Sequence, residues 1–332
     1  MNLRRGCAVL VICLLTAAAC SSDSKPSVAP SSSGPDHSGA SGDASASSAA
    51  IACTRPHAPG QTDATFDFQG VPRTYQLYVP AAYDGTSPVP VVFEFHGYGS
   101  TAKQQVAYGD FRALADRDDF LIVAPDGQDR GGRHFNLGTE PGLQNDIQMV
   151  GALLDVIETQ FCVDTRRVYS TGMSDGGAMT SVLACLSADR FAAFAPVAVV
   201  LYPMVCANTR QLAFEGFSGT ADPIIPFEGG AVRCCGMPVL PAPSVAMSNW
   251  AAHNGCDPNY TEDRLGTEVR RQTWNNCQGG SSAVFYVIDG GGHTWPGSAS
   301  ASGRLGLTTT QIDASETIWD FFKQHPLPSP PR

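Results

Sequence analysis

The chain has 332 residues, of which 43% are hydrophobic and 16% are charged, and it contains 34 glycines and 24 prolines. This composition excludes an intrinsically disordered protein, because so much of the chain can be buried, and a coiled coil, because helix breakers are frequent. The formal net charge of −10 argues against a nucleic-acid partner, since phosphate contacts need a surface rich in Lys and Arg.

The N-terminus has the layout of an export signal. Two arginines precede an apolar run over residues 7–15, and small residues follow up to Cys20. The run is short for a bilayer span, so we predict a signal peptide over residues 1–20 and a mature protein that is extracellular, at the cell surface or periplasmic. Cys20 stands where the cysteine of a bacterial lipobox is lipidated, whereas the small residues before it equally suit ordinary cleavage. We expect a lipid anchor on Cys20 as the protein's only membrane contact.

Residues 21–52 are rich in Ser, Ala, Gly, Pro and Asp and have almost no large apolar side chain. Such a segment cannot bury enough surface to offset its ordering entropy, so it predicts a disordered tether. We place the folded domain at residues 53–325 and a short tail at residues 326–332.

Eight of the 11 cysteines lie beyond the predicted leader and tether. An even number in an exported protein predicts disulfides, whose pairing the sequence does not determine. We predict a bridge between Cys256 and Cys277, which would close one loop-rich segment; a mixture of bridges and buried free thiols is the alternative. The chain has no CxxC pair and no histidine at zinc spacing from these cysteines, so we expect no metal and no cofactor.

Taken in chain order, the folded part alternates strands and helices. Residues 64–79 predict an antiparallel hairpin, and a loop rich in Gly and Arg spans residues 127–142. Buried strands are predicted at 90–95, 120–124, 167–171, 192–200, 212–216 and 284–288, and helices at 103–116, 146–160, 176–186 and 310–323. This alternation predicts an α/β fold with a mainly parallel central sheet and helices on both faces.

A candidate nucleophile lies in Gly172-Met173-Ser174-Asp175-Gly176, between a predicted strand and a predicted helix. A sharp turn at this place needs small flanking residues and lifts the serine oxygen out of the sheet. The backbone N–H of Asp175 then lies at a helix N-terminus, where it can donate to a developing oxyanion. The alternative is that Ser174 only caps the helix.

A nucleophilic serine needs a base, and the base needs a carboxylate that orients it. On α/β sheets the acid and then the base follow the serine, each after a later strand. Asp222 follows the strand at 212–216, and we prefer it to Asp257, in an irregular segment, and to Asp289, which is too close to the histidine in sequence. Among seven histidines we choose His293, which follows the strand at 284–288 within a glycine-rich loop.

A second oxyanion donor is expected after the first central strand, in His96-Gly97-Tyr98-Gly99. In such an arrangement the backbone N–H of Tyr98 points at the anion, while His96 braces the loop.

Five segments together resemble the poly(3-hydroxybutyrate) depolymerase and feruloyl esterase-like group of α/β-hydrolases: Phe95–Gly99, Arg167–Gly177, Ala192–Val197, Gly219–Pro226 and Gly290–Gly297. The resemblance covers residues 65–325 and implies the α/β-hydrolase fold, ester hydrolysis and the same three residues, Ser174, Asp222 and His293. The sequence departs from the family at Tyr98, at Asp175 and at Ser218, where members often have a Cys or small residue, an Asn and a His. Phe135 and Trp295 are candidate substrate-binding aromatics, although Trp295 equally suits packing.

We therefore predict an exported, monomeric serine esterase that acts on polymeric or oligomeric esters. Hydroxyalkanoate polyesters and feruloyl or acetyl esters of plant polysaccharides are the candidate substrates. The alternative from another class is a non-catalytic surface lipoprotein that uses the fold as a binding module. A peptidase is a further alternative, although the chain has no long insertion for the propeller or cap that gates peptides in such enzymes.

Overall fold

The computed structural model describes residues 53–204, 206, 208, 210–235, 239–300 and 303–329. The predicted signal peptide, Cys20 and the tether lie outside the described residues. Within the described part, no helix combines the length and the apolar character needed to cross a bilayer.

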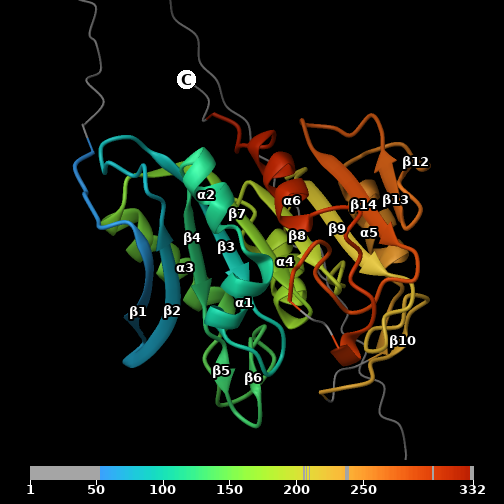
Figure 1. Ribbon diagram of the computed structural model, residues 1–332, viewed down its shortest axis with the longest axis horizontal. Helices are drawn as coiled ribbons and strands as arrows, with labels where there is room; N and C mark the ends of the chain where they lie inside the picture. The colour runs from blue at the N-terminus through green and yellow to red at the C-terminus, as the bar shows by residue number, and fades with distance from the viewer. Residues whose placement is uncertain are drawn as a thin grey trace, which may run out of the picture. The chain divides into compact units, whose positions relative to one another are not determined.

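One ten-stranded sheet forms the centre of the fold (Figure 1). Its strands are β1 (Gly60–Phe68), β2 (Val71–Val79), β3 (Val89–Phe95), β4 (Leu121–Pro125), β7 (Val163–Met173), β8 (Ala193–Val197), β9 (Ala213–Gly219), β12 (Tyr260–Leu265), β13 (Val269–Trp274) and β14 (Ser282–Ile288). Their order is β1-β2-β4-β3-β7-β8-β9-β14-β13-β12. Strands β4 to β14 in this order are parallel, whereas β1 and β2 at one edge and β13 and β12 at the other are antiparallel. The predicted fold class and N-terminal hairpin are confirmed.

Helices cover both faces of the sheet. One apolar core joins β3 and β7 to α1 (Ala102–Gly109), α2 (Arg112–Asp118) and α6 (Ala314–Lys323). The other core joins the opposite face to α3 (Asp146–Gln160), α4 (Asp175–Leu186) and α5 (Pro243–His253). Because both faces are covered, the inner strands have no solvent-facing side, and every residue of β3 and β4 is buried.

Short strands and a 3-10 turn lie in the loops between the main elements. Strands β5 (Gln128–Asp129) and β6 (Arg133–His134) pair as a hairpin in the predicted Gly- and Arg-rich loop, and β10 (Gly230–Ala231) pairs with β11 (Val239–Leu240). A 3-10 turn, η1, spans Gly303–Leu305. Figure 1 shows β5, β6, α1 and β10 at the same end of the sheet, which is where the parallel strands finish.

The structure differs from the sequence-based elements in several places. The predicted helix at 103–116 is two helices, because Asp110 adopts a left-handed conformation with φ of 47° that ends α1. Strands β12 and β13 were not predicted. Strand β12 is exposed along almost all of its length, so it carries no apolar alternation for a sequence pattern to detect.

All eight cysteines among the described residues are paired: Cys53 with Cys162, Cys185 with Cys206, Cys234 with Cys235, and Cys256 with Cys277. The predicted Cys256–Cys277 bridge is confirmed. The alternative that included buried free thiols is wrong for these residues.

Candidate active site

Ser174 occupies a strained turn between β7 and α4. Its φ of 58° and ψ of −114° place it in a region that L-residues rarely adopt. The flanking glycines are required, because a Cβ on Gly172 would lie 2.6 Å from the carbonyl oxygen of Gly176, and one on Gly176 would collide with the carbonyl of Phe95. The Ser174 side chain makes no capping hydrogen bond to α4, so it is not there as a helix cap.

The next two candidate residues meet at the ends of neighbouring strands. His293 Nδ1 lies 2.7 Å from Asp222 Oδ2, and both side chains are buried. Asp222 Oδ1 accepts hydrogen bonds from the backbone amides of Ile224 at 2.7 Å and Ile225 at 2.8 Å. An ionised Asp222 is an acceptor, so it keeps the imidazole proton on Nδ1 and leaves Nε2 with a free lone pair.

Strand order explains how residues 71 positions apart come together. Asp222 follows β9 and His293 follows β14, and these two strands are parallel neighbours. The loops after them are joined by a hydrogen bond of 2.9 Å from Ala221 N–H to the carbonyl of Gly291. Gly219 has no room for a side chain, because a Cβ there would collide with Gly291.

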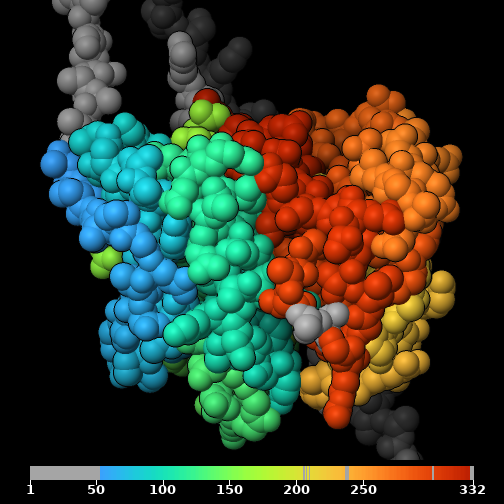
Figure 2. Space-filling model, in the orientation of Figure 1, coloured from blue at the N-terminus to red at the C-terminus, as the bar shows by residue number. Residues whose placement is uncertain are grey.

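Ser174 and His293 line the same pocket, which has a volume of about 600 Å³. The wall also includes the segment Gly97–Ser100, which follows β3, and residues of α1. In Figures 1 and 2 the cyan-to-green α1 region lies beside the red-orange segment that carries His293. Hydrogen bonds join these segments, from the backbone N–H of Trp295 to the Tyr108 hydroxyl at 3.2 Å and from the Ser298 hydroxyl to the Tyr108 carbonyl at 2.9 Å.

The Tyr98 amide is oriented by the peptide bond before it. The carbonyl of Gly97 accepts hydrogen bonds from His96 Nδ1 at 2.8 Å and from the Ser100 amide at 3.1 Å. In a trans peptide the following N–H points the opposite way, so the Tyr98 N–H is directed away from both donors. No acceptor among the described residues takes this N–H. A Cβ on Gly97 would lie 3.3 Å from Ser174 Cβ, which places the segment directly beside the serine.

His96 braces this segment, as the sequence predicts. Its Nε2 accepts a hydrogen bond of 2.9 Å from the Gly127 amide, so the ring proton must be on Nδ1, where it is donated to the Gly97 carbonyl. Burial lowers the pKa of His96 to about 4, so the ring is neutral at physiological pH. The side chain is fully buried.

The β5–β6 hairpin supports the same segment from outside. The Tyr98 hydroxyl donates to the Gly131 carbonyl at 2.9 Å, and the Gly99 amide donates to the Arg133 carbonyl at 2.7 Å. The Tyr98 ring also stacks on His134, with ring centroids 5.6 Å apart. The phenol of Tyr98 is therefore a structural contact of this hairpin.

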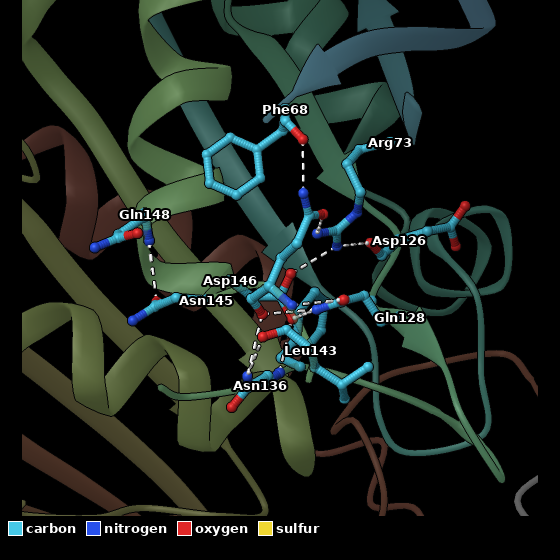
Figure 3. A network of polar contacts seen from close by, with 12 residues as sticks. Phe68, Arg73, Asp126, Gln128, Asn136, Leu143, Asn145, Asp146 and Gln148 are labelled. Carbon is cyan, nitrogen blue, oxygen red and sulfur yellow. Dashed lines mark hydrogen bonds and ion pairs between the residues drawn. The ribbon is translucent and has the colours of Figure 1, made fainter. Parts of the chain in front are cut away.

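A buried polar network fixes the loop that contains the hairpin (Figure 3). The Asp146 carboxylate accepts hydrogen bonds from Arg73 at 2.6 Å, from the backbone N–H of Asn136 at 2.7 Å and from the Gln128 side chain at 3.1 Å. Gln144 adds a hydrogen bond of 2.6 Å to the carbonyl of Phe68, so the network ties the loop to the N-terminal hairpin.

The Asp175 side chain connects the turn at Ser174 to this loop, a role that sequence reasoning missed. Its Oδ2 accepts a hydrogen bond of 2.8 Å from the Phe135 amide, and its side chain is 8% exposed. Burial raises the pKa of Asp175 to about 6. Its backbone N–H is at the first position of α4, where no partner exists within the helix, so it is free to meet an oxyanion.

The structure places Phe135 and Trp295 in the core and not on the pocket wall, which corrects the expectation that they bind substrate. Phe135 is 2% exposed and packs edge-to-face on Phe95. Trp295 is 1% exposed and its indole N–H donates to the Ser315 hydroxyl at 2.9 Å. Neither side chain lines the pocket that contains Ser174 and His293.

The pocket instead has lining residues that sequence reasoning did not select. Apolar and sulfur-containing side chains gather there: Tyr108, Met173, Ile224, Cys234, Cys235 and Leu305. They come from five separate segments of the chain, so no local pattern connects them. Within the described part of the chain, no cluster of three metal-ligating side chains is present.

A family model described as esterase PHB depolymerase matches residues 73–248, more than half of the chain. The chain belongs to this esterase family. The match includes Ser174 and Asp222, and it ends before His293.

Curated relatives extend the similarity. The chain is 28% identical over 257 residues to feruloyl esterase B of Piromyces equi, covering 75% of this chain but only 44% of that protein. It is 28% identical over 260 residues to a probable feruloyl esterase C of Aspergillus oryzae, covering 75% of this chain and 83% of the relative. This chain thus spans less than half the length of the Piromyces protein.

Solved structures agree on the fold. An acetyl xylan esterase from Aspergillus awamori superposes with a TM-score of 0.57 at 14% identity, covering 80% of this chain and 99% of that chain. A thermostable esterase superposes with a TM-score of 0.53 at 16% identity, covering 80% of this chain and 63% of that chain. At these identities the superpositions establish the α/β-hydrolase fold alone.

Proposed function

We propose that this protein is an exported serine esterase that cleaves carboxylic esters through an acyl-enzyme, with Ser174 as nucleophile, His293 as base and Asp222 as the orienting acid. The observation that carries the proposal is that the buried His293–Asp222 pair opens onto the same pocket as a serine held in a strained turn. Membership of an esterase family supports the same reaction class.

In the proposed reaction, His293 Nε2 takes the proton of the Ser174 hydroxyl as the oxygen attacks the ester carbonyl. The backbone N–H groups of Tyr98 and Asp175 receive the oxyanion. The tetrahedral intermediate collapses, and the alcohol leaves with the proton from Nε2. A water molecule then gives a proton to Nε2 as it attacks the acyl-enzyme. The second tetrahedral intermediate collapses, Nε2 returns that proton to Ser174 Oγ, and the acid leaves.

The pocket favours an ester with a large apolar group. Its volume of about 600 Å³ fits a ligand much larger than an acetyl group, and Tyr108, Met173 and Leu305 give the wall an apolar character. Feruloyl esterases among the relatives act on an aromatic acyl group by name. We therefore propose an aromatic-acid ester as substrate in preference to a hydroxybutyrate polyester. Comparing the hydrolysis of methyl ferulate with that of a 3-hydroxybutyrate oligomer tests this choice, and faster cleavage of the oligomer would reverse it.

Export is part of the proposal. The sequence before the domain has the layout of a signal, and four disulfides fit an oxidising compartment. Incorporation of labelled palmitate into the full chain, absent from Cys20→Ala, is the expected result for the proposed lipid anchor. Equal incorporation in both would remove Cys20 from that role.

A fluorophosphonate probe separates an enzyme from a binding module. The probe reacts with activated serines, so the full chain should be labelled and Ser174→Ala should not. Equal labelling of the two proteins, or labelling of neither, would overturn the serine-esterase proposal and favour the non-catalytic alternative.

A further inference from the structure

Two adjacent cysteines, Cys234 and Cys235, form a disulfide in the connection between β10 and β11. Both residues line the pocket that contains Ser174 and His293. Cys234 is half-buried and Cys235 is exposed, so the pair lies where the pocket meets the surface. The bond closes a small ring through the peptide that joins the two residues, and this ring has few conformations open to it.

A disulfide between neighbours contributes little to global stability. In the chain-entropy account, a disulfide stabilises a protein by restricting the unfolded chain, and the effect grows with the length of the closed loop. The other three bridges join residues 109, 21 and 21 positions apart, whereas this bridge joins residues one position apart. Its effect must therefore be sought in the local geometry of the folded pocket.

The backbone at this disulfide is locally constrained. Cys235 has a φ of 65°, in the left-handed region that favours glycine. L-residues adopt this region less readily than the right-handed one, and the covalent ring opposes any rotation of the backbone out of it. The disulfide thus holds the loop in a shape that the backbone alone would not prefer.

The segment is also fixed to the loop that carries the acid. The Arg233 amide, next to the disulfide, donates to the Ile224 carbonyl at 3.1 Å. Ile224 in turn donates its own amide to Asp222 Oδ1 at 2.7 Å and lines the pocket beside the two cysteines. The disulfide therefore has a defined position relative to the Asp222–His293 pair.

We propose that the Cys234–Cys235 disulfide is a specificity-determining wall of the substrate pocket, against which a bulky ring group of the ester packs. A disulfide presents polarisable sulfur and little hydrogen-bonding capacity, and sulfur packs favourably against aromatic rings. Met173, Tyr108 and Leu305 extend the same apolar lining. The wall selects by contact with the part of the ester beyond the scissile carbonyl, and it takes no part in the chemical step. This inference rests on the esterase function proposed above.

The test compares kcat and KM for three esters in the full chain and in the double variant Cys234→Ser/Cys235→Ser. Methyl acetate has no ring, methyl ferulate has its ring in the acyl part, and phenyl acetate has its ring in the alcohol part. We expect KM to rise about fivefold or more for at least one ring ester, with kcat/KM for methyl acetate within about twofold of the full chain. The ring ester that responds identifies the side of the ester that meets the disulfide.

The double variant Cys256→Ser/Cys277→Ser is the matched control, because it also removes one bridge but neither residue lines the pocket. In this control, any change in KM should be the same for the ring esters as for methyl acetate. A second arm uses the unmutated protein after mild treatment with a phosphine reductant. Cys235 is the one exposed half-cystine among the described residues, so this bridge should open first, and mass mapping of alkylated thiols verifies it. Reduction should reproduce the KM shift, and reoxidation should reverse it.

The inference is overturned if opening the bridge changes KM equally for all three esters, or changes KM for none of them. If the double variant does not fold, the reduction arm decides between these outcomes. A failure of the proposed function is recognised differently: the unmutated protein would then hydrolyse none of the esters and would not react with a fluorophosphonate.

Discussion

The Asp222 carboxylate holds the His293 imidazole through one oxygen and the backbone of its own loop through the other. Oδ2 lies 2.7 Å from Nδ1, while Oδ1 accepts the amides of Ile224 and Ile225. The two backbone bonds fix the carboxylate, so the position of the ring does not depend on a freely rotating side chain. This arrangement makes the orientation of the imidazole a property of the β9 and β14 loops.

Asp222→Asn should abolish most activity without unfolding the protein. The amide can offer its N–H₂ to Nδ1 and so stabilise the tautomer that cannot accept the serine proton. An equivalent change in a serine protease lowers kcat by about 10⁴, and we expect a loss of that order for an ester substrate. Asp289→Asn is the control: Asp289 pairs with Arg270 on the surface, and its variant should retain kcat. Similar losses in the two variants would contradict the assignment of Asp222.

Gly97→Ala should lower kcat while leaving the fold intact. The added methyl would lie 3.3 Å from Ser174 Cβ and 3.5 Å from the Met173 carbonyl, so the serine turn and the Tyr98 amide must move apart. Losing one oxyanion donor costs about 10² to 10³ in kcat in a measured case, and misplacement should approach the lower figure. Gly151→Ala, in α3 with open space around the new methyl, should keep full activity and gain about 0.5–1 kcal/mol of stability. Full activity in Gly97→Ala would refute the placement of this segment.

Asp175 should make the stability of the protein depend on pH. Burial raises the pKa of this carboxyl from its ordinary 3.8 to about 6, so between these values the folded state binds more protons than the unfolded state. The free energy of unfolding therefore falls as pH rises through this window, by about 3 kcal/mol. Asp175→Asn removes this contribution, so urea denaturation should show the variant gaining stability relative to the original protein as pH rises from about 4 to about 6.5. Other buried carboxyls are common to both proteins and cancel. Parallel stability curves would contradict the assignment.

Arg73→Met should destabilise the protein strongly. Arg73 and Asp146 form a 2.6 Å pair whose side chains are 5% and 0% exposed, so losing the guanidinium leaves a buried carboxylate without its counter-charge. Such a change costs about 3–5 kcal/mol. Arg112→Met breaks an exposed pair with Asp110 and should cost less than about 1 kcal/mol. Comparable losses in the two variants, measured by urea denaturation, would show that burial of the Arg73–Asp146 pair does not matter.

The sequence by itself determined the features that local patterns encode. Apolar runs at 90–95 and 120–124 predicted buried strands, because strands covered on both faces have no polar face. The turn around Ser174 was recognisable because the tight turn leaves no room for side chains on its flanking residues. A Cβ on Gly176, for example, would collide with the Phe95 carbonyl. The candidates Asp222 and His293 followed from their places after later strands, and the structure brings these two residues into contact.

Only the tertiary structure decided which side chains line the pocket, because this depends on which loops meet in space. Trp295 lies next to the candidate base region in sequence, yet its side chain turns into the core, because the α6 residue Ser315 accepts its indole N–H there. Cys234 and Cys235 gave no sign in the sequence of lying beside Ser174, since the order of the strands brings their loop to the pocket. Periodicity reports whether a residue is buried, but its neighbours across the fold are set by strand order and loop packing, which no local pattern contains.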